Sequence, residues 1–104
     1  MAIQLKESHG SLSTSSGTIL LSSPNTRIVF SMIFHNNHAT EDANVRISLY
    51  DGNINPVRII NVDLKPDESL TFDTKLTLIA NGSVTGQSDQ PSAIGYWVSY
   101  AEIE

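Results

Sequence analysis

The segment at residues 26–37 constrains the fold more than any other part of the chain, because it is the longest apolar stretch in the sequence. Successive side chains of a β-strand point to opposite faces, and this period of two sorts the segment into two rows. One row is entirely apolar: Ile28, Phe30, Met32 and Phe34. The other row mixes apolar with polar side chains: Arg27, Val29, Ser31, Ile33 and His35. We therefore expect a central strand with the first row in the core and neighbours on both edges.

Other segments supply matching apolar rows with the same period, and turn signals separate them. The rows are Val45/Ile47/Leu49, Ile60/Val62/Leu64 and Ile94/Tyr96/Val98. Turns are expected at Pro24-Asn25, at Asn81-Gly82 and at Lys65-Pro66-Asp67-Glu68, where the proline favours a type I turn. About seven strands, or eight with the N-terminal residues, at this spacing predict an all-β fold. We expect a single antiparallel β-sandwich of jelly-roll or immunoglobulin-like type.

The N-terminal residues differ in composition from the rest of the chain. Residues 1–16 are rich in Ser, Thr and Gly, and we expect an N-terminal arm followed by the β-sandwich domain at residues 17–104. Ile3 and Leu5 could dock as an added strand on this domain or on a neighbouring subunit. A frayed tail is the alternative.

Charge and composition argue against several classes of partner. The net charge is -5, the pI is near 4.9 and no Lys/Arg cluster exists, so we expect no binding to nucleic acid or to an anionic membrane surface. The longest apolar stretch is far shorter than the roughly 20 residues that span a bilayer. The first residues lack the pattern of a signal peptide, which predicts synthesis in the cytoplasm. Cysteine is absent, so disulfides and thiolate chemistry are excluded.

Two segments have the residue types of metal ligands without a diagnostic spacing. His35 and His38 precede Glu41 and Asp42, but three-residue spacing suits a helix face, and this segment leaves a strand for a loop. Residues 51–55 resemble the start of a calcium loop, yet Pro56 replaces the required glycine and Val62 the bidentate glutamate. The sequence therefore predicts no metal and no cofactor.

Catalytic signatures are lacking as well. No serine lies in a Gly-x-Ser-x-Gly elbow, and nothing in the sequence marks a histidine as its base. The acidic pairs at residues 41–42 and 67–68 are adjacent on loops, where solvation explains them. We expect a protein that is not an enzyme.

Five apolar residues are candidates for an interface between subunits: Ile3, Leu5, Val29, Ile33 and Trp97. Val29 and Ile33 belong to the half-apolar face of the central strand, which we expect the N-terminal arm or another subunit to cover. Trp97 stands between small neighbours on the last strand, where it could belong to the core or anchor a partner.

The order of these features between residues 22 and 104 resembles a group of small virion proteins of tailed bacteriophages, which serve as head decoration, neck and tail accessory subunits. The resemblance lies in an apolar strand that ends in asparagines, a following strand, a strand that leads into a proline turn, and a turn before the final aromatic strand. The segments that carry it are residues 28–37 (IVFSMIFHNN), 45–50 (VRISLY), 59–70 (IINVDLKPDESL) and 76–82 (LTLIANG). Asp67 departs from the pattern, which often has glycine after the proline.

The resemblance implies a structural role without catalytic residues. It implies a bacteriophage virion protein, made in the host cytoplasm, that docks on and reinforces capsid, neck or tail components as a symmetric homo-oligomer. An alternative from the residues is a carbohydrate- or receptor-binding module that uses exposed aromatic side chains and two Asn-rich loops, at residues 35–43 and 51–56.

Overall fold

The computed structural model describes residues 2–20, 23–50, 56–73 and 75–103, and these form nine β-strands. The strands are β1 (Ile3–Ser11), β2 (Gly17–Leu20), β3 (Thr26–Asn36), β4 (Ala43–Tyr50), β5 (Val57–Leu64), β6 (Ser69–Phe72), β7 (Leu76–Leu78), β8 (Ser83–Gln87) and β9 (Ile94–Ile103). In this part of the chain no helix is long and apolar enough to cross a membrane. The predicted all-β sandwich is confirmed. The structure has nine strands where seven or eight were expected, because the apolar alternation of Leu70, Phe72, Leu76 and Leu78 is divided between two short strands, β6 and β7.

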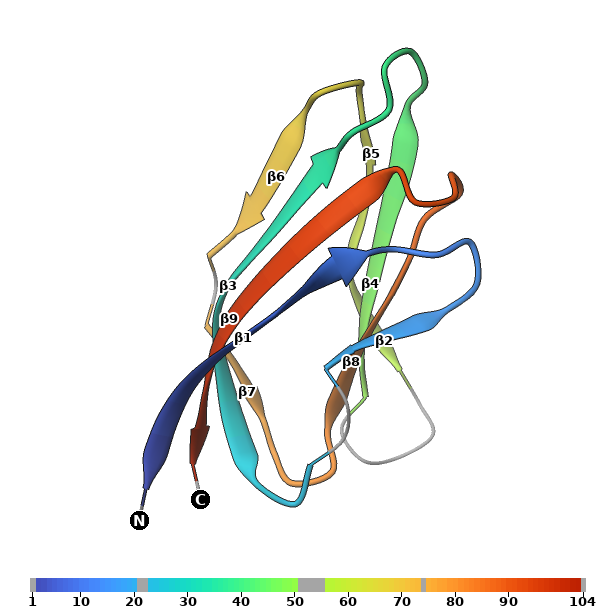
Figure 1. Ribbon diagram of the computed structural model, residues 1–104. Helices are drawn as coiled ribbons and strands as arrows, with labels where there is room; N and C mark the ends of the chain where they lie inside the picture. The colour runs from blue at the N-terminus through green and yellow to red at the C-terminus, as the bar shows by residue number, and fades with distance from the viewer. Residues whose placement is uncertain (1, 21–22, 51–55, 74, 104) are drawn as a thin grey trace.

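The strands form two antiparallel sheets that face each other (Figure 1). One sheet has the order β1-β9-β3-β6, with β7 also paired to β3, and the other has the order β2-β8-β4-β5. The pairings β1–β9, β2–β8 and β4–β5 are those of one long hairpin whose arms run from the chain ends to the β4–β5 connection. Rolling this hairpin brings β3 beside β9 and β4 beside β8. This strand order is that of a jelly roll.

A β-bulge in β3 changes which of its side chains enter the core. The pairing of β3 with β9 shifts between Val29 and Ser31, so Phe30 is an extra residue. Val29 and Phe34 are fully buried, whereas Phe30 remains 37% exposed. The prediction of one uninterrupted core row from Ile28 to Phe34 is therefore wrong. The bulge lies where the other neighbour of β3 changes from β7 to β6, and an inserted residue turns the following side chains to the opposite face.

The core lies between the two sheets, and most predicted rows contribute to it. Val45, Ile47, Ile94 and Val98 are fully buried, as their alternation predicts. Val62 departs from its row: it is 37% exposed, since β5 is an edge strand and the sandwich covers it only in part. Burial of these side chains is the main favourable contribution to folding in a chain that has no disulfide.

The turn after β5 also differs from its predicted type. The backbone N–H of Glu68 donates to the carbonyl oxygen of Lys65 (3.0 Å), and Asp67 has a φ of 63°. A positive φ at the third position belongs to a type II turn, not to type I. Asp67 thus occupies the position where glycine is favoured.

The N-terminal residues form the edge strand β1, which pairs with β9 from Ile3 to Ser11. Among the described residues no other strand pairs with β1. Eight of its nine residues are exposed, because the second sheet covers little of this strand. In Figure 1 the start of β1 and the end of β9 run side by side to the two chain ends.

Candidate interaction face

The outward-facing side of the β1-β9-β3-β6 sheet collects four of the five candidate interface residues. Directly paired residues of antiparallel strands share a face. Trp97 pairs with His9 on one side and with Ile33 on the other, and Leu5 pairs with Ala101, which lies four residues farther along β9 and so faces the same side. Ile3, Leu5, Ile33 and Trp97 therefore share this face. Val29 pairs with Tyr100 and is fully buried in the core, because the bulge lies between it and Ile33.

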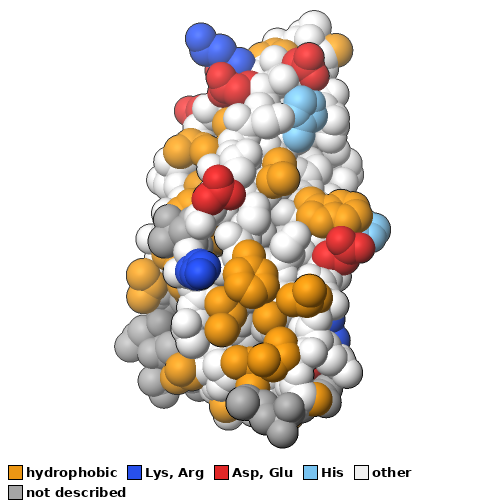
Figure 2. All heavy atoms as spheres, turned by 90° about the vertical axis from the view of Figure 1, so that its left-hand side faces the viewer, with side chains coloured by type: hydrophobic (Ala, Val, Ile, Leu, Met, Phe, Trp, Pro, Cys, Tyr) orange, Lys and Arg blue, Asp and Glu red, His pale blue; other side chains and the backbone are white. Residues whose placement is uncertain are grey.

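Large apolar side chains on this face are exposed to solvent. They come from three neighbouring strands, and we call them the apolar face: Ile3 (63% exposed), Leu5 (80%), Phe30 (37%), Ile33 (42%) and Trp97 (42%). The outer side of a sandwich sheet is normally polar, since it faces water. Figure 2 shows hydrophobic side chains gathered on one side of the molecule, mainly in its lower half. A cluster of exposed apolar side chains on one face is typical of an interaction site.

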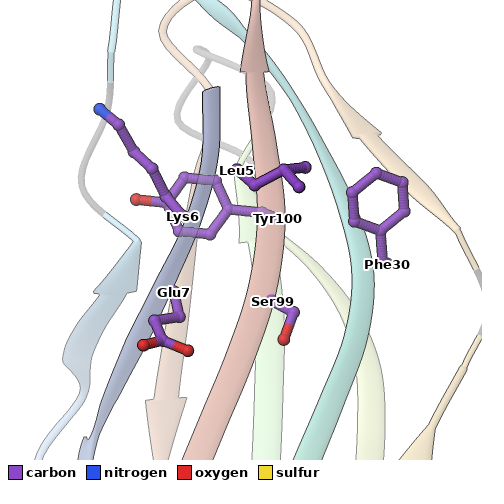
Figure 3. A pocket seen from close by; sticks show the side chains of 6 residues that line it. All are labelled: Leu5, Lys6, Glu7, Phe30, Ser99 and Tyr100. Atoms are coloured by element: carbon purple, nitrogen blue, oxygen red, sulfur yellow. The ribbon is translucent and has the colours of Figure 1, made fainter. Parts of the chain in front are cut away.

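A groove of about 450 Å³ crosses the apolar face above Ser99 (Figure 3). Leu5 reaches across β9 toward Phe30, and Glu7 lies farther along β1 (Figure 3). The groove exists because Ser99, a small residue, stands on the middle strand between larger neighbours. The sequence offers both causes, the small residue and the large ones, but their juxtaposition depends on strand pairing.

A second groove, of about 400 Å³, lies farther along the same face above Gly95. Its lining includes Ile33, His35 and Trp97. The ring of His9 stacks on Trp97 with 4.7 Å between centroids and 12° between planes. This cross-strand contact fixes the orientation of the indole, which stands between the two grooves.

One group of three side chains resembles a catalytic triad. His35 Nδ1 lies 2.5 Å from Ser69 Oγ, and His35 Nε2 lies 3.0 Å from Asp67 Oδ1. The sequence did not mark this group, because more than 30 residues separate His35 from the other two and only the β3–β6 pairing brings them together. The Asp67 side chain is 95% exposed, so it lacks the burial that makes such a carboxylate effective in orienting a catalytic histidine. The contacts fasten the turn at residues 65–68 to β3.

His38, the second histidine of the segment that was considered as a metal site, has a different role. His38 Nδ1 accepts hydrogen bonds from the backbone N–H groups of Thr40 (3.2 Å) and Glu41 (3.0 Å). Asn36, fully buried, donates to the carbonyl oxygens of Glu41 and Leu64. These bonds build the loop after β3. In residues 2–20, 23–50, 56–73 and 75–103, no three His, Asp or Glu side chains cluster as metal ligands would, and the calcium-like residues 51–55 lie outside these ranges.

A buried polar cluster, which the sequence did not reveal, lies at the opposite end of the core from Asn36. Arg27 is 3% exposed and donates from Nη2 to the carbonyl oxygen of Gly82 (2.6 Å). Its cross-strand neighbour Glu102 accepts a hydrogen bond from Lys6 Nζ (2.8 Å). This bond, opposed by burial of the carboxylate, lowers the pKa of Glu102. The cluster ties β1, β3 and β9 together.

Comparison of the sequence with known families and with curated proteins gives no match. Comparison of the structure gives several. A chain from the acid-stable capsid structure of a Helicobacter pylori bacteriophage has a TM-score of 0.64 at 9% identity, over 99% of this chain and 89% of that one. A chain from Bacillus endospore appendages, described as disulfide-linked pili, has a TM-score of 0.61 at 14% identity, over 97% and 85%.

A third similar structure is a pentameric capsid protein from metagenomic phage sequences. Its TM-score is 0.51 at 17% identity, over 93% of this chain and 60% of that one. At these identities the likeness is one of fold. The chain thus shares its jelly roll with subunits of phage capsids and of a pilus.

Proposed function

We propose that the chain is a non-enzymatic structural protein of a bacteriophage virion, which docks on and reinforces capsid, neck or tail components. It is made in the host cytoplasm and acts in the virion as a symmetric homo-oligomer. The observation that carries this proposal is the apolar face on a jelly roll. Chains from phage capsids have a similar fold, and the apolar face supplies a surface on which a neighbour can pack.

The exposed apolar area of this face favours association with a partner. Burying apolar surface contributes about 25 cal/mol per Å², so covering the side chains of Leu5, Ile3 and Trp97 is favourable by several kcal/mol in total. A single exposed leucine would call for no explanation, but five large apolar side chains on one sheet face do. The protein has only 6 Lys and Arg against 11 Asp and Glu, which favours protein partners over nucleic acid.

The proposed absence of catalysis is supported by the geometry around His35. Its two partners are exposed, and Ser69 lines neither of the two grooves. A reaction site needs a shielded pocket where a substrate is held beside the nucleophile. The turn at residues 65–68 offers no such enclosure.

The proposal is tested on virions that carry the gene for this chain. Mass spectrometry of purified particles is expected to detect the protein, and particles that lack it are expected to release their genome at a lower temperature. Leu5→Asp places a charge on the apolar face and should abolish incorporation into particles. Val57→Asp is the matched control, because Val57 is an exposed apolar residue as well (63%, against 80% for Leu5) but lies on the edge strand of the other sheet. Absence of the wild-type chain from purified particles would refute the proposal.

A carbohydrate- or receptor-binding module is the second candidate function. The groove above Gly95 favours it, since the groove places an exposed indole, Trp97, beside the polar side chains of His35 and Ser11. Glycan-array binding that Trp97→Ala abolishes would support this function. Incorporation into virions without any glycan binding would support the structural role instead.

A further inference from the structure

We propose that two copies of this chain pack their apolar faces against each other as a symmetric dimer, with the two-fold axis crossing the strands at the level of Val98. This inference deepens the proposed structural role by naming the first partner in assembly. In this dimer, the partner that covers the apolar face is a second copy of the chain.

The strand register fixes which residues meet across such an axis. His9, Trp97 and Ile33 lie at one level of the sheet, and Glu7, Ser99 and Ser31 lie at the next level on the same face. Val98 stands midway between the two levels. A two-fold rotation about an axis through this midpoint exchanges the levels, so that each residue of the first level faces a residue of the second level in the other copy.

The exchange places Trp97 of each copy above the Ser99 groove of the other. That groove has a volume of about 450 Å³, and its lining combines Leu5, Phe30 and Tyr100 with the polar residues Lys6, Glu7 and Ser99. Trp97 projects from the same strand, 42% exposed, and His9 holds its ring in place. Aromatic side chains that fill a groove of the partner are often the residues that contribute most to the binding energy of an interface.

The polar side chains on the face also match in this arrangement, since a ring N–H of histidine can donate to a carboxylate. Glu7 of one copy faces His9 of the other, and the symmetry makes this contact twice. Phe30, in the bulge beside Ser31, faces the level of Ile33. An axis parallel to the strands would instead set Trp97 against Trp97 and one Ser99 groove against the other, which leaves both grooves unfilled.

The broad side of the molecule is large enough to hold an interface of standard size. The molecule measures 47 × 27 × 19 Å, so its broad side has an area on the order of 1,000 Å². Each partner of a standard interface buries about 800 Å². Two sheets packed face to face keep their strands within about 30° of alignment, which an axis across the strands allows.

Trp97 is the only tryptophan of the chain, so tryptophan fluorescence directly reports whether the proposed interface is formed. Sedimentation equilibrium of the purified wild-type protein should give a monomer–dimer equilibrium. The Trp97 emission should shift to longer wavelength and become more accessible to acrylamide on dilution, in step with dissociation. Phe30→Ala should weaken the dimer at least about 30-fold, which corresponds to a contribution typical of a central interface residue. Val57→Ala, on the other sheet, should leave the dimer unchanged.

Crosslinking distinguishes the proposed axis from other dimers. Because the chain has no cysteine, Glu7→Cys and His9→Cys each introduce one thiol. A short bismaleimide should link a mixture of the two variants, Glu7→Cys to His9→Cys, more efficiently than either variant alone. Equal linking of Glu7→Cys to itself would overturn the proposed axis.

Two results would overturn the dimer. One is a monomer at the highest soluble concentration, and the other is a dimer in which Trp97 stays as accessible to acrylamide as in the diluted protein. Neither result bears on the virion role, which is measured on particles. A monomer that enters virions through the apolar face would refute the second copy as the occupant and leave the virion role standing.

Discussion

Lys6 Nζ donates a 2.8 Å hydrogen bond to Glu102 Oε2 and so joins the edge strand β1 to β9. Glu102 is 9% exposed and lies beside the buried Arg27 across the β3–β9 pairing. The rest of β1 is held mainly by its backbone ladder with β9. The Lys6–Glu102 bond is thus a side-chain attachment of the N-terminal strand to the sandwich, close to the groove that Leu5 borders.

The stability of the protein should fall in acid through Glu102. The hydrogen bond from Lys6 lowers the pKa of Glu102 in the folded state. Its contribution to stability is therefore fully present above the ordinary glutamate pKa of about 4.3 and is lost as the pH falls through the lowered folded-state pKa. Denaturant midpoints measured from pH 7 down to acid should decline less steeply for Glu102→Gln than for the wild type.

Lys6→Met tests the assigned cause of this pH dependence. Without the ammonium group the pKa of Glu102 should move back toward its ordinary value, and the acid-dependent part of the stability should shrink. If both variants decline with pH as the wild type does, another carboxylate governs the acid lability.

Phe34 and Phe30, on the same strand, should respond very differently to truncation. Phe34 is fully buried and Phe30 is 37% exposed. Phe34→Ala should lower the free energy of unfolding by about 3–5 kcal/mol, because it leaves a cavity in the core. Phe30→Ala should cost about 1 kcal/mol or less in a dilute solution of monomers. Equal losses would mean that β3 continues without the bulge.

Phe34 and Phe30 also illustrate which features of the fold can be predicted from the sequence and which cannot. Period-two alternation places Val45, Ile47, Ile94 and Val98 in the core, because these strands keep a regular register on the side that faces the other sheet. The same rule fails at Phe30, where a bulge coincides with the change of partner strand from β7 to β6, a pairing that local alternation does not reveal. The strand order of a jelly roll, as opposed to an immunoglobulin-like fold, likewise depends on pairings between distant segments.

The candidate interaction face was likewise predictable only in part. Ile33 and Trp97 are large apolar residues on the half-apolar sides of their strands, and this signal was sufficient to select them. Their meeting on one face, with Leu5 two levels away, follows from the register of β1, β9 and β3. Val29 had the same signal as Ile33 but lies on the other side of the bulge, in the core. Apolar character was readable from the sequence, and the side of the sheet was not.

Replacing Asp67 by glycine should leave a more stable protein than replacing it by alanine. Its φ of 63° is a left-handed conformation that costs a residue with a Cβ roughly 1 kcal/mol, whereas glycine adopts it freely. Both substitutions remove the contact with His35, so comparing Asp67→Gly with Asp67→Ala isolates the backbone effect. The glycine variant should have the larger free energy of unfolding by about 1 kcal/mol. An alanine variant that is at least as stable would contradict the assignment of a type II turn.

Ser69 should not behave as a nucleophile despite its 2.5 Å contact with His35. An acyl-transfer site needs free N–H donors for the developing oxyanion. The N–H groups of Asp67 and Glu68, which precede Ser69, already donate to the carbonyl oxygens of Asn36 (2.9 Å) and Lys65 (3.0 Å). The aspartate is also too exposed to hold the histidine in a water-excluded site.

A fluorophosphonate probe is therefore expected to leave Ser69 unmodified under conditions that label a known serine hydrolase completely. Ser69→Ala should cost about 1 kcal/mol or less of stability, the contribution of one exposed hydrogen bond. Stoichiometric labelling of the wild type that Ser69→Ala abolishes would instead establish a reactive serine. In that case the trio of His35, Asp67 and Ser69 would be an active site, and the non-enzymatic role proposed for this jelly roll would fail.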